Sequence, residues 1–81
     1  MQMTLLEGKI GQEYQVTGLD LEENIMRRLE SLGIFEGTRI RILNKKKQGA
    51  IIIKVRGTRW ALGREMAGGI SAKERLDEKD N

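Results

Sequence analysis

The side chains most able to do chemistry in this 81-residue sequence are nine bases that follow one another without an intervening acid. They are Arg39, Arg41, Lys45, Lys46, Lys47, Lys54, Arg56, Arg59 and Arg64. Residues 1–36 hold seven acids and three bases, and residues 65–81 are nearly balanced. Because the positive charge is concentrated in one stretch, we expect one face of the protein to prefer an anionic partner.

Catalysis and tight metal binding have few candidate groups. The sequence contains no His and no Cys, which are the commonest general base and the commonest ligands for transition metals. No nucleophile–base pair, phosphate-binding loop or convergent pair of carboxylates is visible. The sequence therefore predicts a protein that is not an enzyme and requires no cofactor. Glu7, Glu13 and Glu65 leave room only for a weak surface contact with Fe²⁺ or another divalent cation.

Strand alternation positions most of the bases. In "TRIRIL" (38–43), Ile40 and Ile42 face one way and Arg39 and Arg41 the other. The segments "AIIIKVR" (50–56) and "TRWAL" (58–62) repeat the pattern. Their predicted inward residues are Ile51, Ile53, Val55, Trp60 and Leu62. Lys54, Arg56 and Arg59 then point outward, and adjacent strands would gather these bases on one outer surface.

A helix of about three turns precedes these strands. Its apolar stripe is Leu21, Ile25, Leu29 and Leu32, and Asp20 is its predicted N-cap. Gly33 stands where a helix ends on a left-handed residue, with Leu29 and Ile34 placed to contact each other across the end. Gly37 predicts a tight turn into the next strand, and Phe35 lies in that turn, outside the apolar stripe.

The whole pattern is mainly β with one helix. Further strands are expected in "QEYQVTGLDL" and "ISA", with a short helical turn at "GREMAGG". Five short strands suit a small, partly open barrel capped by the helix. We expect one domain over residues 1–73 and a disordered charged tail over 74–81. With no signal peptide and no long apolar run, a cytoplasmic protein is expected.

The ordered motifs resemble a known family. The pattern R-L-x-x-L-G-[IL]-x-x-G is formed by Arg28, Leu29, Leu32, Gly33, Ile34 and Gly37. Two alternating strands, "RGTRWALGREMA" and a terminal "GI" follow it. From about Thr4 to Ala72 the chain is similar to the FeoA family, ferrous iron transport protein A, and to the SH3-like C-terminal domain of metal-dependent repressors. One difference is the loop "NKKKQGA", which lacks the proline usual in the family.

The resemblance implies an SH3-like barrel in the cytoplasm that assists the membrane ferrous-iron transporter FeoB. Family members are thought to dock on its cytoplasmic, GTP-binding part, which would hold the protein at the inner face of the membrane. The resemblance also implies transition-metal binding, in the general sense in which it is attributed to the family. It implies protein–protein interaction rather than catalysis.

The candidate partner-binding residues are Arg27, Arg28, Ile34, Phe35, Arg39, Arg41, Lys54, Arg56 and Arg59. Each has a simpler explanation, since Arg27 and Arg28 suit the C-terminal end of a helix and the other bases suit a solvated sheet face. An acidic protein, the anionic inner leaflet and RNA are the possible anionic partners. The alternative function is thus a basic small barrel that binds RNA, although one Phe, one Tyr and one Trp offer few stacking platforms. A homo-oligomer built through barrel edges also stays open.

A DNA-reading helix is disfavoured by the acids on the exposed helix face. These are Glu22, Glu23 and Glu30, which phosphates would repel. A groove for proline-rich peptides is disfavoured as well, because the chain has too few aromatic side chains to line one.

Overall fold

The computed structural model describes residues 3–75. Within them the strands are β1 (Met3–Thr4), β2 (Glu13–Leu19), β3 (Arg39–Lys45), β4 (Ile51–Val55), β5 (Thr58–Leu62) and β6 (Ile70–Glu74). The helices are the 3₁₀ turn η1 (Leu5–Glu7), α1 (Glu23–Ser31) and the short α2 (Arg64–Gly68). The mainly β class with one long helix is therefore confirmed.

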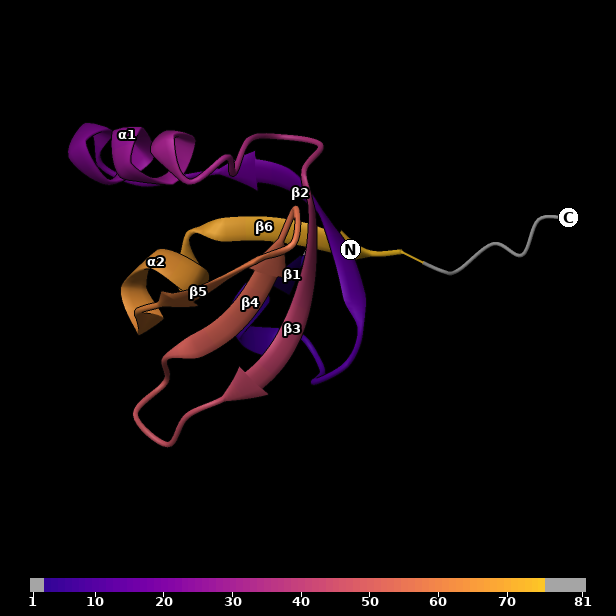
Figure 1. Ribbon diagram of the computed structural model, residues 1–81. Coiled ribbons are helices and arrows are strands. Elements are labelled where there is room, and N and C mark those ends of the chain that lie inside the picture. The colour runs from indigo at the N-terminus through magenta and orange to yellow at the C-terminus, as the bar shows by residue number, and fades with distance from the viewer. Residues whose placement is uncertain (1–2, 76–81) are drawn as a thin grey trace, which may run out of the picture.

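All strand pairs are antiparallel, and the sheet order is β1-β6-β2-β3-β4-β5. The sheet curls on itself, and α1 lies at one end of it (Figure 1). β1 and β5 are the two edges and do not pair with each other, so the barrel is partly open. The sheet has one strand more than the five predicted. Two residues of β1 are too few to show alternation in the sequence.

The core lies inside the curl of the sheet. Its alternating inward residues were predicted correctly on β3 and β4, where Ile40, Ile42, Ile51, Ile53 and Val55 are buried. On β5 only Leu62 is buried, and Trp60 is half-buried against the edge of the core. Trp60 is less buried than predicted because β5 is an edge strand, so within residues 3–75 no further strand lies along its free edge to cover the side chain.

The helix α1 ends as predicted but begins differently. Leu29 and Ile34 are both fully buried, and the N–H of Ile34 donates to the Leu29 carbonyl at 2.9 Å, while Gly33 donates to Glu30. Gly33 has a φ of +85°, the left-handed conformation of such a helix end. The predicted N-cap Asp20 is wrong: its N–H donates to the Gly69 carbonyl, and helix geometry starts only at Glu23.

The last strand runs slightly beyond the predicted domain boundary at residue 73. β6 includes Glu74, and the N–H of Arg75 donates to the Glu13 carbonyl at 2.9 Å. The rest of the tail predicted over 74–81, residues 76–81, lies outside the described residues. Among residues 3–75, no helix is long and apolar enough to cross a membrane.

Candidate functional site

A row of charged side chains crosses four neighbouring strands on the outer face of the sheet. Strand register sets Glu13 opposite Arg41, Arg41 opposite Lys54, and Lys54 opposite Arg59. Directly opposite residues share a face, so the four side chains form one line of an acid followed by three bases. We call Arg41, Lys54 and Arg59 the basic row.

The three bases of the row are not equivalent. Arg41 is held by its neighbours, with Nη2 3.1 Å from Glu13 Oε1 and Nη1 donating to the Gly11 carbonyl at 2.7 Å. Lys54 and Arg59 are exposed, and neither forms an ion pair within residues 3–75. Like charges directly opposite each other on a sheet are destabilising. The unneutralised pair Lys54–Arg59 is thus available to an external anion.

An apolar hollow adjoins the basic row. The pairing of β3 with β4 shifts between Ile42 and Asn44, so Leu43 and Asn44 both lie opposite Ile52. Alternation from the inward Ile42 places Leu43 on the outer face, and the bulge lets Asn44 lie beside it there, next to Ile52. The hollow has a volume of about 380 Å³, and its lining is Leu43, Asn44, Lys46, Ile52 and Arg59. It therefore combines an apolar floor with two cationic walls.

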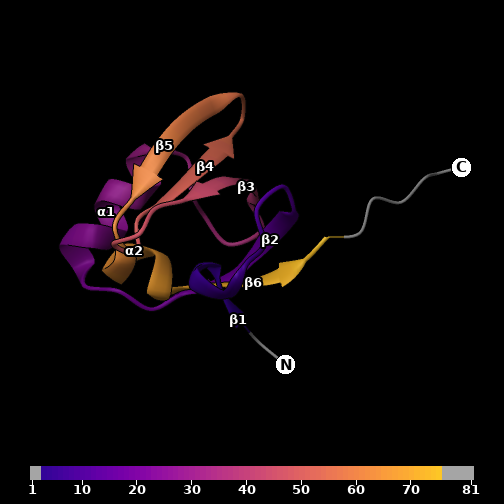
Figure 2. The same cartoon turned by 90° about the horizontal axis from the view of Figure 1, so that it is seen from below.

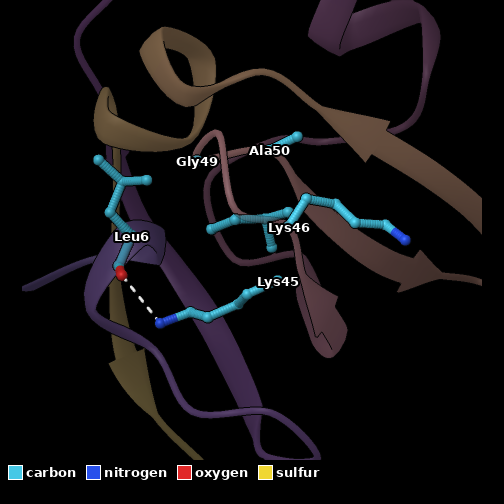
Figure 3. Close-up of a pocket in the computed structure, with 6 residues that line it drawn as sticks. Leu6, Lys45, Lys46, Gly49 and Ala50 are labelled. Atoms are coloured by element: carbon cyan, nitrogen blue, oxygen red, sulfur yellow. Dashed lines mark hydrogen bonds between the residues drawn. The ribbon is translucent and has the colours of Figure 1, made fainter.

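Lys45, the last residue of β3, and Lys46, the first residue of the loop after it, direct their charges to different places. Lys45 reaches back to η1, where its Nζ donates to the Leu6 carbonyl at 3.0 Å beside a second hollow of about 110 Å³ (Figure 3). Lys46 points away from Lys45 in the same view. Lys45 is thus engaged within the protein, whereas Lys46 contributes its charge to the hollow next to the basic row.

The corner between α1 and β3 forms a separate exposed feature. Thr38 organises it: its Oγ1 accepts from the Phe35 N–H at 2.9 Å and donates to the Gly33 carbonyl at 3.3 Å. The Thr38 N–H donates to the Phe35 carbonyl, and Gly37 has a φ of +93°, as a turn of this kind requires. Phe35 is 45% exposed as a result.

Two other candidates contribute differently to this corner. Ile34 is fully buried, so its side chain positions the turn and lies away from the surface. Arg56 comes from the β4–β5 hairpin turn, where it has a φ of +52°. Its Nη1 lies 3.8 Å from the point that a Cβ on Gly33 would occupy, which brings a cation beside the C-terminal end of α1.

The remaining arginines of the candidate set are exposed and dispersed. Arg27 pairs with Glu23 on α1 at 3.2 Å, with both side chains more than 70% exposed, so this pair contributes little. Arg28 is exposed in the last turn of α1. Arg39 lies on β3 opposite Gln15 and two residues from Arg41. The structure therefore gathers Arg41, Lys54 and Arg59 and leaves Arg27 and Arg28 apart from them.

The carboxylates considered as metal ligands are also apart. Glu7 Oε1 accepts from the Thr4 N–H at 2.9 Å as part of a capping box, and Glu13 pairs with Arg41. Glu65 lies in the first turn of α2. No group of three acidic side chains able to hold a metal ion occurs within residues 3–75.

The FeoA domain model matches residues 3–74 of the sequence. The chain belongs to the FeoA family. The family is associated with ferrous iron transport, as the resemblance in the sequence implied.

Solved structures of the family have the same fold as this FeoA-family chain. An iron uptake regulatory protein (FeoA) is 31% identical, with a TM-score of 0.84 over 93% of this chain and 100% of that one. A FeoA-like protein from Clostridium acetobutylicum is 26% identical, with a TM-score of 0.82 over 99% of this chain and 94% of that one. A search of the curated proteins found no match.

A repressor shares the fold at lower identity. A manganese-dependent transcriptional repressor is 21% identical, with a TM-score of 0.84 over 91% of this chain and 42% of the repressor. The SH3-like fold expected from the sequence is confirmed by this likeness.

Sequence reasoning missed the hollow of this FeoA-family chain. Strict alternation in "TRIRIL" already turns Leu43 outward, but it gives no sign of the bulge that turns Asn44 outward as well. One available signal was the run Ile51–Ile52–Ile53, because in a strand the middle residue of three must face opposite to the other two. Ile52 thus predicts an apolar spot on the otherwise basic outer face.

Proposed function

We propose that this FeoA-family chain is a non-catalytic accessory protein of ferrous iron uptake. It docks on the cytoplasmic, GTP-binding part of a FeoB-type transporter and so works in the cytoplasm, at the inner face of the membrane. The observation that carries the proposal is the unneutralised pair Lys54–Arg59 beside the hollow of Leu43 and Ile52, in a family associated with ferrous iron transport.

The surface suits a protein partner better than RNA. Single-strand binders combine basic grooves with aromatic platforms on which bases stack. Here Tyr14 is buried and Trp60 faces the barrel interior, so Phe35 is the one well-exposed aromatic side chain in residues 3–75. An apolar hollow walled by cations suits a partner that offers both an acidic and an apolar side chain.

Titration of the transporter's isolated cytoplasmic domain with this protein tests the proposal. Wild type is expected to bind in the micromolar range, and Arg59→Glu to weaken binding by about tenfold or more, since a close charge pair across an interface can couple by about 1.5 kcal/mol or more. Phe35→Ala and Arg28→Glu measure the part played by the α1–β3 corner. Lys73→Glu is the matched control, because Lys73 is exposed on β6, three positions from β4 in the sheet order.

Absence of wild-type binding in the tens of micromolar would refute the docking proposal. Equal loss of binding in Arg59→Glu and Lys73→Glu would refute the assignment to the basic row. Labelled single-stranded RNA at low and high salt serves as the counter-test, because binding that falls steeply with salt would favour the RNA-binding alternative.

A further inference from the structure

The outer edge of β5 is unpaired within the described residues. β5 pairs with β4 on one side, and β1, the other end of the sheet, pairs with β6 alone. Figure 2 shows β5 as the outermost strand, with β4 on its inner side. An open edge of this kind can accept a further strand from another chain.

The strand register identifies which backbone groups of β5 point away from β4, toward the free edge of the sheet. A two-residue turn at Arg56 and Gly57 makes Val55 and Thr58 the first hydrogen-bonded pair of the β4–β5 hairpin. Since hydrogen-bonded and non-hydrogen-bonded pairs alternate, Trp60 and Leu62 also direct their backbone groups to β4. The N–H and C=O groups of Arg59 and Ala61 therefore face away from the sheet. No hydrogen bond occupies them within residues 3–75.

The side chains along this edge select what can pair there. Arg59 and Ala61 project onto the outer face, beside Lys54 and Ile52 on β4. Arg59 also forms a wall of the hollow that holds Leu43 and Lys46. A strand added to this edge would thus meet two cations and an apolar hollow on its outer face.

A second copy of this chain is a poor occupant. Two β5 edges pairing antiparallel would bring Arg59 of each copy close to the other, and Lys54 and Lys46 beside Arg59 are also positive. Like charges on paired strands are destabilising. An acidic strand reverses the sign of each of these contacts. The charge of the edge thus favours a foreign acidic segment over self-association.

We propose that the β5 edge is a strand-addition site for an extended acidic segment of a partner protein. The segment pairs antiparallel with β5, as every strand pair of this sheet does. Its backbone bonds to Arg59 and Ala61, and its carboxylates contact Arg59 and Lys54. An apolar residue on the same face packs over the small side chain of Ala61, toward Ile52 at the near side of the hollow. If the partner is the transporter, this strand addition rests on the proposed function. The peptide test below applies to any acidic partner.

The test uses a synthetic heptapeptide, Thr-Glu-Thr-Leu-Thr-Glu-Thr, which places two carboxylates and a leucine on one face of a strand. Trp60 is the sole tryptophan of the sequence and lies half-buried in β5, so its fluorescence reports on binding at this edge. We expect saturable binding at low salt. The same peptide with Lys in place of Glu should bind at least about tenfold more weakly.

Two N-methylated peptides test the backbone contacts directly. In an antiparallel pair, directly opposite residues share a face, and those opposite Arg59 and Ala61 point their N–H groups at β5. Methylating the amides of the Glu and Leu residues should therefore abolish binding, whereas methylating those of the central Thr residues should leave it nearly unchanged. Contacts through side chains alone would make the two peptides equal and overturn the proposal.

Protein variants complete the test. Ala61→Pro removes the outward N–H and leaves the hydrogen bonds to β4 in place, since proline is tolerated where an edge strand faces solvent. It should lose peptide binding with an unchanged circular dichroism spectrum. Arg59→Glu should weaken binding by about tenfold and provides the second variant if Ala61→Pro unfolds. Undiminished binding by a folded Ala61→Pro, or no binding by wild type, would overturn the strand-addition site. Peptide binding without binding to the transporter domain would refute only the proposed function.

Discussion

The hydroxyl of Thr38 is a small group on which the exposed position of Phe35 depends. It bonds to the N–H of Phe35 and the carbonyl of Gly33, and the residue is only 9% exposed. Thr38→Val keeps the shape but leaves both backbone groups without this partner. We expect a loss of about 1–3 kcal/mol in the free energy of unfolding, measured by urea denaturation.

Thr17 supplies the matched control for Thr38. Its Oγ1 is buried and has no hydrogen-bond partner among residues 3–75. Thr17→Val therefore removes an unsatisfied polar atom, and unfolding should be unchanged or slightly harder. Equal destabilisation by the two Thr→Val changes would contradict the role given to the Thr38 hydroxyl.

The same Gly→Ala substitution should change the stability of the protein in opposite directions at two of its glycines. Gly33 has a left-handed backbone, so Gly33→Ala should lower stability by about 1–2 kcal/mol although space for a methyl group exists. Gly18 lies in β2, is not among the positive-φ glycines, and has nothing within 4 Å of the point that a Cβ would occupy. Gly18→Ala should raise stability by about 0.4–1 kcal/mol through the unfolded chain. Thermal or urea unfolding of both variants checks the pair, and the reverse order would contradict the assigned conformations.

At the level of elements, local signals were the reliable ones. The end of α1 was predictable from Leu29, Gly33 and Ile34, because a helix stop is encoded within six residues. The start was not, because Asp20 bonds instead to the carbonyl of Gly69, which is distant in sequence. The bulge at Leu43 likewise depends on how β4 pairs with β3. Sequence reasoning found the bases of the candidate site but missed the hollow beside them, to which the bulge adds Asn44.

The central position of β4 predicts a conflict between stability and binding. Lys54 lies between Arg41 and Arg59 in the register, so it faces a like charge on each side. Lys54→Glu converts both pairs to opposite charges, and each such pair contributes about 0.2–1 kcal/mol. We expect a more stable protein by urea denaturation that binds the transporter domain more weakly. Lys73→Glu should change neither quantity appreciably. A destabilised Lys54→Glu would show that the row is not repulsive.

For the molecule as a whole, the two ends of the sheet serve different purposes. β1 is short and continues into η1, where the Glu7 carboxylate and the Thr4 hydroxyl complete a capping box. β5 is five residues long, and the stretch 37–64 that contains it has nine bases and no acid. Bases along an exposed edge discourage pairing with other copies of the chain. The same bases leave the edge open to an acidic partner, so one feature provides both solubility and selectivity.

The charge distribution of the whole molecule predicts opposite salt effects on folding and on docking. The basic stretch 37–64 repels itself in the free protein, and the Debye length shortens from about 30 Å at 0.01 M to about 8 Å at 0.15 M salt. Added salt should therefore leave stability in urea unchanged or slightly raised. It should also slow association with the transporter domain, because long-range attraction acts mainly on the association rate. Surface plasmon resonance at several salt concentrations separates the two rates. Arg59→Glu should flatten the salt dependence, whereas Lys73→Glu should flatten it less. An effect confined to the dissociation rate would contradict electrostatic steering by the basic face and leave only short-range contacts to account for docking.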